Sequence, residues 1–496
     1  MASSTKSHQA IVVGTGFGGM GAAISLKRLG IDDFVMLDRE DDLGGTWHVN
    51  RYPGLAVDIA SVTYSYSFEP NPHWSHWYAR GPELKKYAEH VADRYDLRRH
   101  MRFGAAVEGA TWDEESEEWE VRVAGGERLR ASYLITATGF LSQPKKPDIA
   151  GVDDFAGAVI HTAKWDDTAD LDGKRVAIIG TGATAVQLIP ELARRAGHLT
   201  VFQRTPIWVT PKLDREMPGV VQQLFAKVPV TQRTARRANT AVLEAIMVAG
   251  VLHYRQAKVF NRMAERIAKR HLRKQVADPE LRRKLTPDYS FGCKRPTFSN
   301  SYYRAFTRDH VDLETESIER ITPTGVVTAD GRETEVDVLV LATGFDMWDT
   351  NFPAIAIAGR EGRDLGTWWR ESRFQAYEGI AVPQFPNLLN LASPYAYSGL
   401  SFFTTIEAQM NHVERLLGEV RRRGATTFEV TDPANAEFLG WATERLEDSV
   451  FQLGSCATAR SYYFNQHGEA ALLRPSSTIH THRAAESFPL DDYAYA

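Results

Sequence analysis

Cysteine is scarce in this chain of 496 residues: only Cys293 and Cys456 occur, and they lie far apart in the sequence. Two distant cysteines do not form a disulfide framework, so we expect no structural disulfide. Free thiols are typical of a reducing compartment, which predicts a cytoplasmic protein. The chain also lacks a Cys-x-x-Cys pair of the kind found in dithiol redox enzymes.

Long hydrophobic runs are absent as well. The longest, Ala241–Leu252, is interrupted by Glu244 and is too short to span a bilayer. We interpret it as a buried or interface helix, while a helix bound to a membrane surface stays open. The N-terminus, Met1–Gln9, is polar and lacks the apolar core of a signal peptide. We therefore expect no stable insertion in a membrane.

The chain has no large excess of one charge, since its net charge is −5. Nothing in this balance indicates a nucleic acid or an anionic membrane as partner. The pairs His73/His76 and His480/His482 lack a third ligand, so no metal site is predicted. The length allows two or three domains, and the sequence does not indicate an oligomeric state.

The first recognisable pattern is a βαβ opening. The apolar run Gln9–Val13 predicts a buried strand, Met20–Leu29 a helix, and Phe34–Leu37 a second strand that ends at Asp38. Between strand and helix lies a glycine motif that comprises Gly14, Gly16, Phe17, Gly18 and Gly19. Such a turn lets backbone N–H groups approach a pyrophosphate, and an acid at the end of the second strand accepts hydrogen bonds from a ribose. The pattern favours the adenosine half of FAD.

A second copy begins at Arg175. Strand Val176–Ile179 and strand Leu199–Gln203 flank a glycine turn and a helix that reaches Ala193. The turn contains Gly180, Gly182, Thr184 and Ala185. Here the second strand is followed by Arg204 and Thr205 in place of an acid. Because a guanidinium pairs with a 2′-phosphate that a carboxylate would repel, this site should prefer NADPH to NADH. A surface salt bridge is the alternative role for Arg204.

Two Ala-Thr-Gly-Phe segments, ending at Phe140 and Phe345, each follow an apolar run late in one of the two lobes. They indicate an α/β protein with two Rossmann-like dinucleotide-binding domains, for FAD and NADP, the second inserted in the first. The basic, helix-patterned stretch between them predicts a helical insertion, either over the site or as a peripheral decoration. We expect the FAD domain at 1–145 and 339–496, which includes a C-terminal loop, the NADP domain at 150–208 and 290–338, and the helical insertion at 209–289.

Two dinucleotide sites in one chain imply hydride transfer from a nicotinamide to a flavin. Without a cysteine pair or a metal site, the remaining common electron acceptor is O2. The sequence therefore predicts an FAD- and NADPH-dependent oxygenase.

Three further segments resemble signatures of the type I Baeyer–Villiger monooxygenases, which belong to the class B flavoprotein monooxygenases. They are Phe155-Ala-Gly-Ala-Val-Ile-His-Thr-Ala-Lys-Trp-Asp166, the stretch Gly44–Asp58, and Lys294-Arg295 with Tyr302-Tyr303. Flavin-containing amine and sulfide monooxygenases carry Phe or Tyr where Trp165 stands. The resemblance covers most of the chain and is weakest over 210–288.

This resemblance implies conversion of a ketone to an ester or lactone with O2 through a C4a-peroxyflavin. It implies that Arg295 lies over the flavin as a permanent positive charge and that Asp58 positions it; an Asp that caps a helix is the alternative for Asp58. Lys294 and Arg204 would clamp the 2′-phosphate, with Thr205 beside them. The implied cofactor-binding set also includes Gly45, Thr46, Trp47, Tyr52, Tyr64, Val107 and Gly344.

Several alternatives remain at this point. His161 either organises the domain hinge or is a buried, hydrogen-bonded histidine. Ser461-Tyr462-Tyr463 departs from the Ser-Trp-Tyr of the family's C-terminal loop, which leaves loop closure and substrate range open. The pairs Phe402-Phe403 and Trp368-Trp369 are expected in the core rather than in a pocket wall. Oxygenation at nitrogen or sulfur, alone or besides ketone oxidation, and a redox-sensing flavoprotein are the other functions considered.

Overall fold

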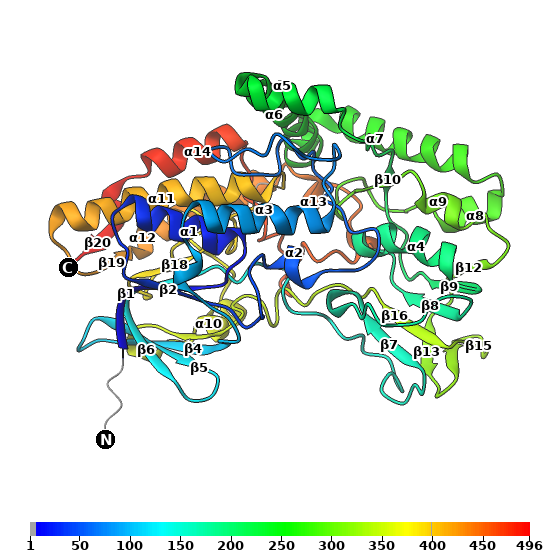
Figure 1. Cartoon of the computed structure of the whole chain (residues 1–496), viewed down its shortest axis with the longest axis horizontal. Helices are drawn as coiled ribbons and strands as arrows, with labels where there is room; N and C mark the ends of the chain where they lie inside the picture. Colours follow the sequence, from blue (N-terminus) through cyan, green and yellow to red (C-terminus); the bar gives the residue numbers. More distant parts are fainter. Residues whose placement is uncertain (1–5, 398) are drawn as a thin grey trace.

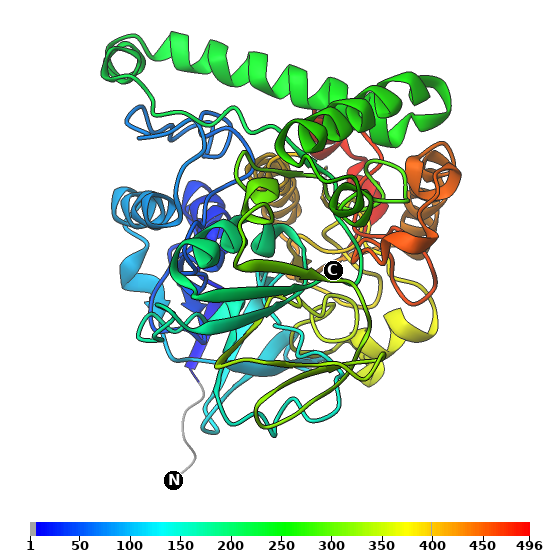
Figure 2. The ribbon, with the colours of Figure 1, turned by 90° about the vertical axis from the view of Figure 1, so that its right-hand side faces the viewer.

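The computed structural model describes residues 6–397 and 399–496, so Met1–Thr5 of the expected polar N-terminus lie outside the description. Two largely parallel sheets lie beside one another, and helices cover them (Figure 1). A third group of helices forms the upper edge of the molecule, as the perpendicular view also shows (Figure 2). This arrangement confirms the α/β class with two dinucleotide-binding domains.

The first sheet has eight strands in the order β17-β4-β5-β6-β1-β2-β3, and β18 pairs with β6. Their bounds are β1 Lys6–Val13, β2 Phe34–Leu37, β3 Met101–Arg102, β4 Val107–Asp113, β5 Glu118–Val123, β6 Arg128–Thr136, β17 Ala356–Ala358 and β18 Leu388–Asn390. The apolar run Gln9–Val13 forms part of β1, as predicted. It is apolar because β1 lies between two parallel neighbours, β2 and β6, and buries both of its faces. The chain leaves this sheet after β6 and returns at β17, which confirms that the second domain is inserted in the first.

The second sheet has the order β12-β9-β8-β16-β7. Its strands are β7 Ala158–His161, β8 Arg175–Ile179, β9 His198–Phe202, β12 Val311–Glu314 and β16 Val338–Leu341; a small sheet of β13 Ile318–Ile321, β14 Gly325–Thr328 and β15 Glu333–Glu335 follows β12. All four residues of β16 pair with β8 and β7. The expected domain boundary between 338 and 339 therefore falls inside a strand of this sheet.

Helices complete both domains. Around the first sheet lie α1 Phe17–Arg28, α2 Thr46–Val49, α3 Gly81–Arg94, η1 Arg98–His100, η4 Arg360–Gly362, α10 Leu365–Glu371, α11 Phe402–Arg423, α12 Asp432–Leu446, α13 Val450–Leu453, η5 Ala457–Ala459, α14 Thr478–Ser487 and η6 Leu490–Asp492, with the pair β19 Phe428–Val430 and β20 Tyr493–Tyr495. The second domain adds η2 Thr162–Lys164, α4 Ala183–Arg195 and α9 Tyr302–Ala305. Helix α1 begins three residues before the predicted Met20, because the glycine motif itself supplies its first turn.

The helical insertion consists of α5 Gly219–Lys227, α6 Pro229–Glu244, the π-helix η3 Ala245–Leu252, α7 Tyr254–Gln275 and α8 Pro279–Lys284, between the short strands β10 Val209–Thr210 and β11 Thr297–Phe298. The apolar run Ala241–Leu252 is helical, as predicted. Its end is buried at Val251 and Leu252, whereas Val242 and Ile246 are exposed. No helix in the described part of the chain has the length and hydropathy to cross a bilayer.

Cys293 and Cys456 form a disulfide, which corrects the expectation that this chain has none. The two residues are 163 positions apart, yet their Cα atoms lie 5.2 Å from one another. The prediction was wrong because distance along the sequence says little about distance in space. The fold brings the C-terminal segment with Cys456 back to the stretch before β11 that contains Cys293. The pairing also removes the argument for a reducing compartment that rested on free thiols.

Candidate active site

One cavity of about 2140 Å³ is lined by residues from both domains. A pocket for a single small ligand usually measures roughly 300–1,000 Å³. The cavity is therefore large enough for two dinucleotides, and a substrate beside them. It runs along the carboxyl ends of β1 and β8, where open α/β sheets bind their ligands.

The first glycine of each motif explains why the cavity begins there. Gly14 has φ 109° and Gly180 has φ 111°, a conformation that favours glycine. A Cβ on Gly14 would lie 2.5 Å from the carbonyl oxygen of Ala137, and one on Gly180 would lie 2.4 Å from that of Ala342. Each glycine turn thus packs against one Ala-Thr-Gly segment, which leaves its backbone free on the cavity side.

Nearly all the predicted site residues line this one cavity. They are Gly14, Gly16, Phe17, Gly18, Asp38, Gly45, Thr46, Trp47, Tyr52, Asp58, Tyr64, Val107, Gly180, Gly182, Thr184, Arg204, Thr205, Lys294, Arg295 and Gly344. Gly19 and Ala185 do not line it. They hold the third position of their motifs, which packs the helix against its strand: a Cβ on Gly19 would lie 1.9 Å from the carbonyl oxygen of Gly14.

Asp38 already has partners within the protein. The backbone N–H and hydroxyl of Thr15 donate to its Oδ2 at 2.7 and 2.6 Å, and the N–H of Glu40 donates to Oδ1 at 3.1 Å. A carboxylate has about four acceptor positions, so Asp38 keeps capacity for a ribose hydroxyl. Its bonds to Thr15 also fix the glycine turn to the end of β2.

Arg295 and Asp58 form a two-pronged ion pair on the cavity wall. Nε of Arg295 donates to Oδ2 of Asp58 at 2.8 Å, and Nη2 donates to Oδ1 at 3.0 Å. The remaining Nη1 donates at 2.8 Å to the hydroxyl of Tyr397, which in turn donates to the carbonyl of Leu400 at 2.9 Å. Three acceptor atoms therefore fix the plane of one guanidinium.

The electrostatics of this pair keep both partners ionised. Burial raises the pKa of Asp58, but the charge and hydrogen bonds of Arg295, a backbone hydrogen bond and the charge of Lys212 together outweigh it, so the pKa lies below its ordinary value. For Arg295, burial lowers the pKa, but the charge of Asp58, the neighbouring Tyr397 and Tyr463, and the hydrogen bonds to Asp58 together raise the pKa well above its ordinary value. The cavity thus holds a positive charge that does not titrate.

A second cationic group lines the same cavity. Burial, and next the charge of Arg204, lower the pKa of Lys294 to about 8. Burial and Arg460 likewise lower the pKa of Arg204. No carboxylate pairs with these three side chains in the described residues, although all three line the cavity. The cluster is suited to an anion such as a 2′-phosphate, and it does not form the surface salt bridge considered for Arg204.

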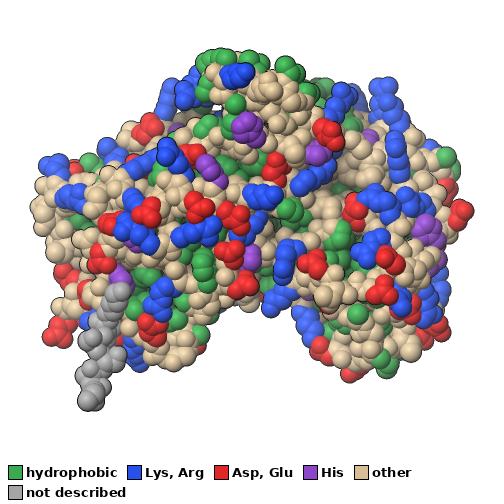
Figure 3. Space-filling view, in the orientation of Figure 1, with side chains coloured by type: hydrophobic (Ala, Val, Ile, Leu, Met, Phe, Trp, Pro, Cys, Tyr) green, Lys and Arg blue, Asp and Glu red, His purple; other side chains and the backbone are tan. Residues whose placement is uncertain are grey.

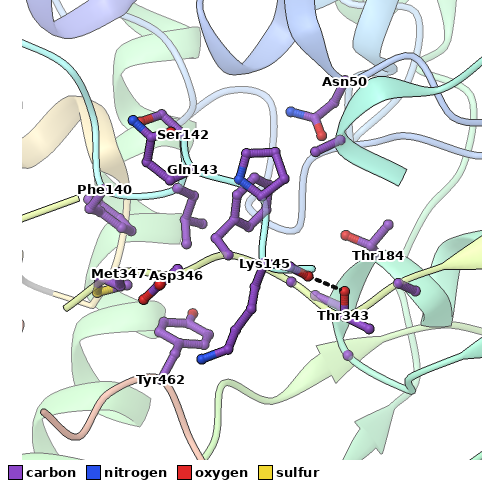
Figure 4. A pocket seen from close by; sticks show the side chains of 18 of the residues that line it. Asn50, Phe140, Ser142, Gln143, Lys145, Thr184, Thr343, Asp346, Met347 and Tyr462 are labelled. Carbon is purple, nitrogen blue, oxygen red and sulfur yellow. Dashed lines mark hydrogen bonds between the residues drawn. The ribbon is translucent and has the colours of Figure 1, made fainter. Parts of the chain in front are cut away.

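The two chain crossovers between the domains lie side by side at the centre of the cavity. The N–H of Lys145 donates to the carbonyl of Gly344 at 2.9 Å, and the N–H of Asp346 donates to that of Gln143 at 2.9 Å. The hydroxyl of Thr343 also donates to the carbonyl of Lys145, as Figure 4 shows. The crossovers therefore form a short two-stranded hinge.

His161 contacts this hinge and does not line the cavity. Its Nδ1 accepts from the N–H of Ala163 at 3.1 Å, and its Nε2 lies 3.4 Å from the hydroxyl of Thr343. Burial lowers the pKa of His161, which favours the neutral ring. The contacts fit both alternatives, a histidine that organises the hinge and a hydrogen-bonded histidine that only fills its place.

Several cavity residues were missed by the sequence analysis. Tyr397, Arg460 and Lys145 carry no motif, and only their long-range neighbours mark them. Tyr462, which was noted as a departure, does line the cavity, and Figure 4 shows its ring pointing into it. Of the aromatic pairs, Phe402 lines the cavity, whereas Phe403 and Trp369 are fully buried in the core.

Comparison with known proteins agrees with this geometry. Residues 11–248 match the family described as pyridine nucleotide-disulphide oxidoreductase. The chain is 38% identical to a Baeyer-Villiger monooxygenase of Streptomyces coelicolor over 99% of its own length and 94% of that protein. It superposes on the closed crystal structure of cyclohexanone monooxygenase with a TM-score of 0.88 and 30% identity, covering 99% and 100% of the two chains. It superposes on the OTEMO complex with FAD and NADP with a TM-score of 0.87 and 28% identity, covering 99% and 100%.

Fold, cavity and comparisons together define an FAD- and NADPH-dependent flavoprotein monooxygenase. Neither Cys293 nor Cys456 lines the cavity, so their disulfide is not placed to exchange electrons with a flavin bound there. The chain belongs to the Baeyer–Villiger monooxygenase family.

Tyr397→Phe is expected to lower kcat for oxygenation about tenfold, because a hydrogen bond to a charged group is worth about 1.5–3 kcal/mol. KM for NADPH should stay the same, since Tyr397 contacts Arg295 and not the cluster of Lys294 and Arg204. Steady-state kinetics measure both. Tyr395→Phe is the matched control, because Tyr395 is buried in the same loop outside the cavity. An unchanged kcat in Tyr397→Phe would show that Asp58 alone positions the guanidinium.

The disulfide joins the residue before Lys294 to the loop that carries Arg460 and Tyr462. Cys293→Ser/Cys456→Ser is expected to lower the free energy of unfolding by about 2–4 kcal/mol, since a cross-link over a long loop restricts the unfolded chain. Thermal unfolding with and without dithiothreitol measures this. The reductant should destabilise the wild type and leave the double variant unaffected; equal responses would contradict the prediction.

Proposed function

We propose that this enzyme converts a ketone to an ester or lactone by Baeyer–Villiger oxidation with NADPH and O2. The observation that carries the proposal is the guanidinium of Arg295, fixed on the cavity wall by Asp58 and Tyr397. A permanent cation in a partly closed cavity stabilises negative charge on oxygen, which carbonyl attack generates and oxygenation of sulfur or nitrogen does not require.

When bound, FAD supplies the activation of O2 and NADPH supplies the hydride. The chain's own residues create the electrostatic field in which this happens. At a separation of ~4 Å and an effective dielectric of ~20, one positive charge contributes ~4 kcal/mol before desolvation is counted. Asp58 keeps the guanidinium in one orientation, so that its outward N–H groups face the oxygen that becomes negative.

The cofactor-binding roles form part of the same proposal. The turn from Gly14 to Gly18, with Asp38 and the Gly45–Trp47 segment, is suited to the adenosine and pyrophosphate of FAD. The turn at Gly180 and Gly182 is suited to the pyrophosphate of NADPH, and Arg204 with Lys294 to its 2′-phosphate. Thr205 and Thr184 add hydroxyl donors beside them. The cluster of Lys294, Arg204 and Arg460 supports this division, because an anion with two or more negative charges would balance cations that no carboxylate of the described residues pairs with.

The domain limits and the location of the enzyme are also proposals. We place the NADP domain at 150–208 and 290–341, which moves the second limit to the end of β16, and the helical insertion at 209–289. The FAD domain comprises 1–145 and the chain from 342 on. We also propose a cytoplasmic location, and the only support for it is that the enzyme needs NADPH. Fractionation of the producing cells tests it.

A ketone panel tests the function. The purified holoenzyme is incubated in air with NADPH and cyclic, linear and aryl ketones, and products are identified by mass. The proposal expects a product heavier by one oxygen atom, formed with one NADPH per product. Sulfides and tertiary amines serve as the competing panel. If the sulfides or amines are oxygenated and none of the ketones is, the result would favour a heteroatom monooxygenase.

A further inference from the structure

The helical insertion presents apolar side chains to solvent. Most of the exposed large hydrophobic side chains in the described residues lie on it. On α5 and the residue after it, Val220, Leu224 and Val228 recur every fourth position with exposed fractions of 74%, 46% and 42%. On α7, Val259, Met263 and Ile267 do the same with 67%, 52% and 45%. Such spacing places each set along one helix face.

The inward face of α6 is attached by polar contacts instead. The only buried side chain of α6 is Gln232, which donates to the carbonyl of Asn71 at 2.7 Å. Arg236 donates to the carbonyl of Ser65 at 2.7 Å, and Asn239 donates to the hydroxyl of Thr63 at 2.7 Å. Helix α6 is thus fixed in one orientation. Helices α5 and α7 bury some apolar side chains, such as Phe225 and Leu272, while the side chains of the two stripes stay exposed.

The insertion is also strongly cationic. Residues 219–275 contain twelve Lys and Arg and two Glu, a net charge of +10 in a chain whose total is −5. Eleven of these twelve basic side chains are exposed. Figure 3 shows hydrophobic and basic side chains together along the upper edge of the molecule, over α5 and α6. Apolar stripes beside cations are typical of helices that lie in a membrane interface.

We propose that α5, α6 and α7 dock the enzyme on an anionic lipid bilayer, with the apolar stripes in the acyl boundary and the basic side chains among the headgroups. Charge decides between the possible occupants. A second copy docked through the same face would bring another charge of +10 against the first, and a nucleic acid would leave the apolar stripes without a partner. A lipid surface satisfies both features. None of the described residues of α5, α6, η3 and α7 lines the cavity, so docking leaves the active site accessible.

Co-sedimentation of the full-length holoenzyme with vesicles tests this proposal. The vesicles contain phosphatidylcholine alone or with one third phosphatidylglycerol, at low and at high salt. We expect binding to the anionic vesicles that weakens as salt increases, and weaker binding to the neutral ones. Val259→Ser/Met263→Ser/Ile267→Ser should lower the partition coefficient at least tenfold, since all three side chains are exposed and apolar.

The matched control is Leu453→Ser/Ile479→Ser, which removes exposed apolar side chains outside the insertion. It should bind vesicles like the wild type, and both variants should keep the solution activity of the enzyme. The proposal is overturned if anionic vesicles do not bind the wild type at low salt, or if the triple variant binds them equally well. It is also overturned if the stripes instead mediate a dimer that light scattering detects in the wild type and not in the triple variant.

Discussion

Arg295→Ala is expected to lower kcat for ketone oxidation by about 10²–10³, the usual effect of removing one group that stabilises an oxyanion. Reduction of the bound flavin by NADPH should continue, because that step needs the nicotinamide site and not this guanidinium. The variant should therefore consume NADPH without forming ester. Stopped-flow reduction and product analysis by mass separate the two steps.

Two further variants control this experiment. Arg295→Lys keeps the charge and loses the two-pronged bond to Asp58, so it should retain part of the activity. Asp58→Asn/Arg295→Leu removes both charges and avoids an unpaired buried carboxylate, which by itself would destabilise the protein. Ketone oxidation at the wild-type rate in Arg295→Ala would contradict the proposed role and leave a different group as the oxyanion partner.

Lys294→Ala/Arg204→Ala is expected to raise KM for NADPH by about 10²–10⁴, because each cation contributes about 1.5–3 kcal/mol through a charge-assisted bond to the 2′-phosphate. KM for NADH should change little, since NADH lacks this phosphate. Steady-state kinetics with both cofactors give the ratio. Lys145→Ala is a suitable control, because Lys145 also lines the cavity but is not assigned to the phosphate.

The pKa of Lys294 adds a pH dependence to this prediction. The free enzyme has a Lys294 pKa of about 8, and binding of a 2′-phosphate raises it because the anion favours the charged form. Affinity for NADPH is therefore full below pH 8 and declines as the pH rises through the pKa of the complex. KM for NADPH should rise up to about tenfold per pH unit in this range. KM for NADH, and KM for NADPH in Lys294→Arg, should stay level; a rise in either would assign the effect to another group.

Membrane docking and the active site act through different parts of the chain. The variants on α7 should leave the kinetics in solution unchanged, whereas those at Arg295 and Lys294 should leave vesicle binding unchanged. Each proposal can therefore be contradicted without affecting the other.

The local patterns of the chain sufficed for the two nucleotide-binding halves. A buried parallel strand needs a continuous apolar run, and a turn with φ near 110° favours glycine, so β1, β8, Gly14 and Gly180 follow from residues close in sequence. The lack of a Cys-x-x-Cys pair and of a predicted metal site pointed to O2 as the electron acceptor. The signatures around Asp58 and Trp165 then indicated the family.

Only the tertiary structure decided which distant residues meet. Arg295 lies 237 positions from Asp58 and 102 from Tyr397, and Cys293 lies 163 from Cys456. No local pattern encodes such contacts, because they depend on how two sheets and their crossovers pack. The same holds for the helical insertion. Its sequence predicted helices, but which of their apolar residues stay exposed depends on how the helices pack, through the polar contacts of α6 with residues 63–71 and the buried side chains of α5 and α7.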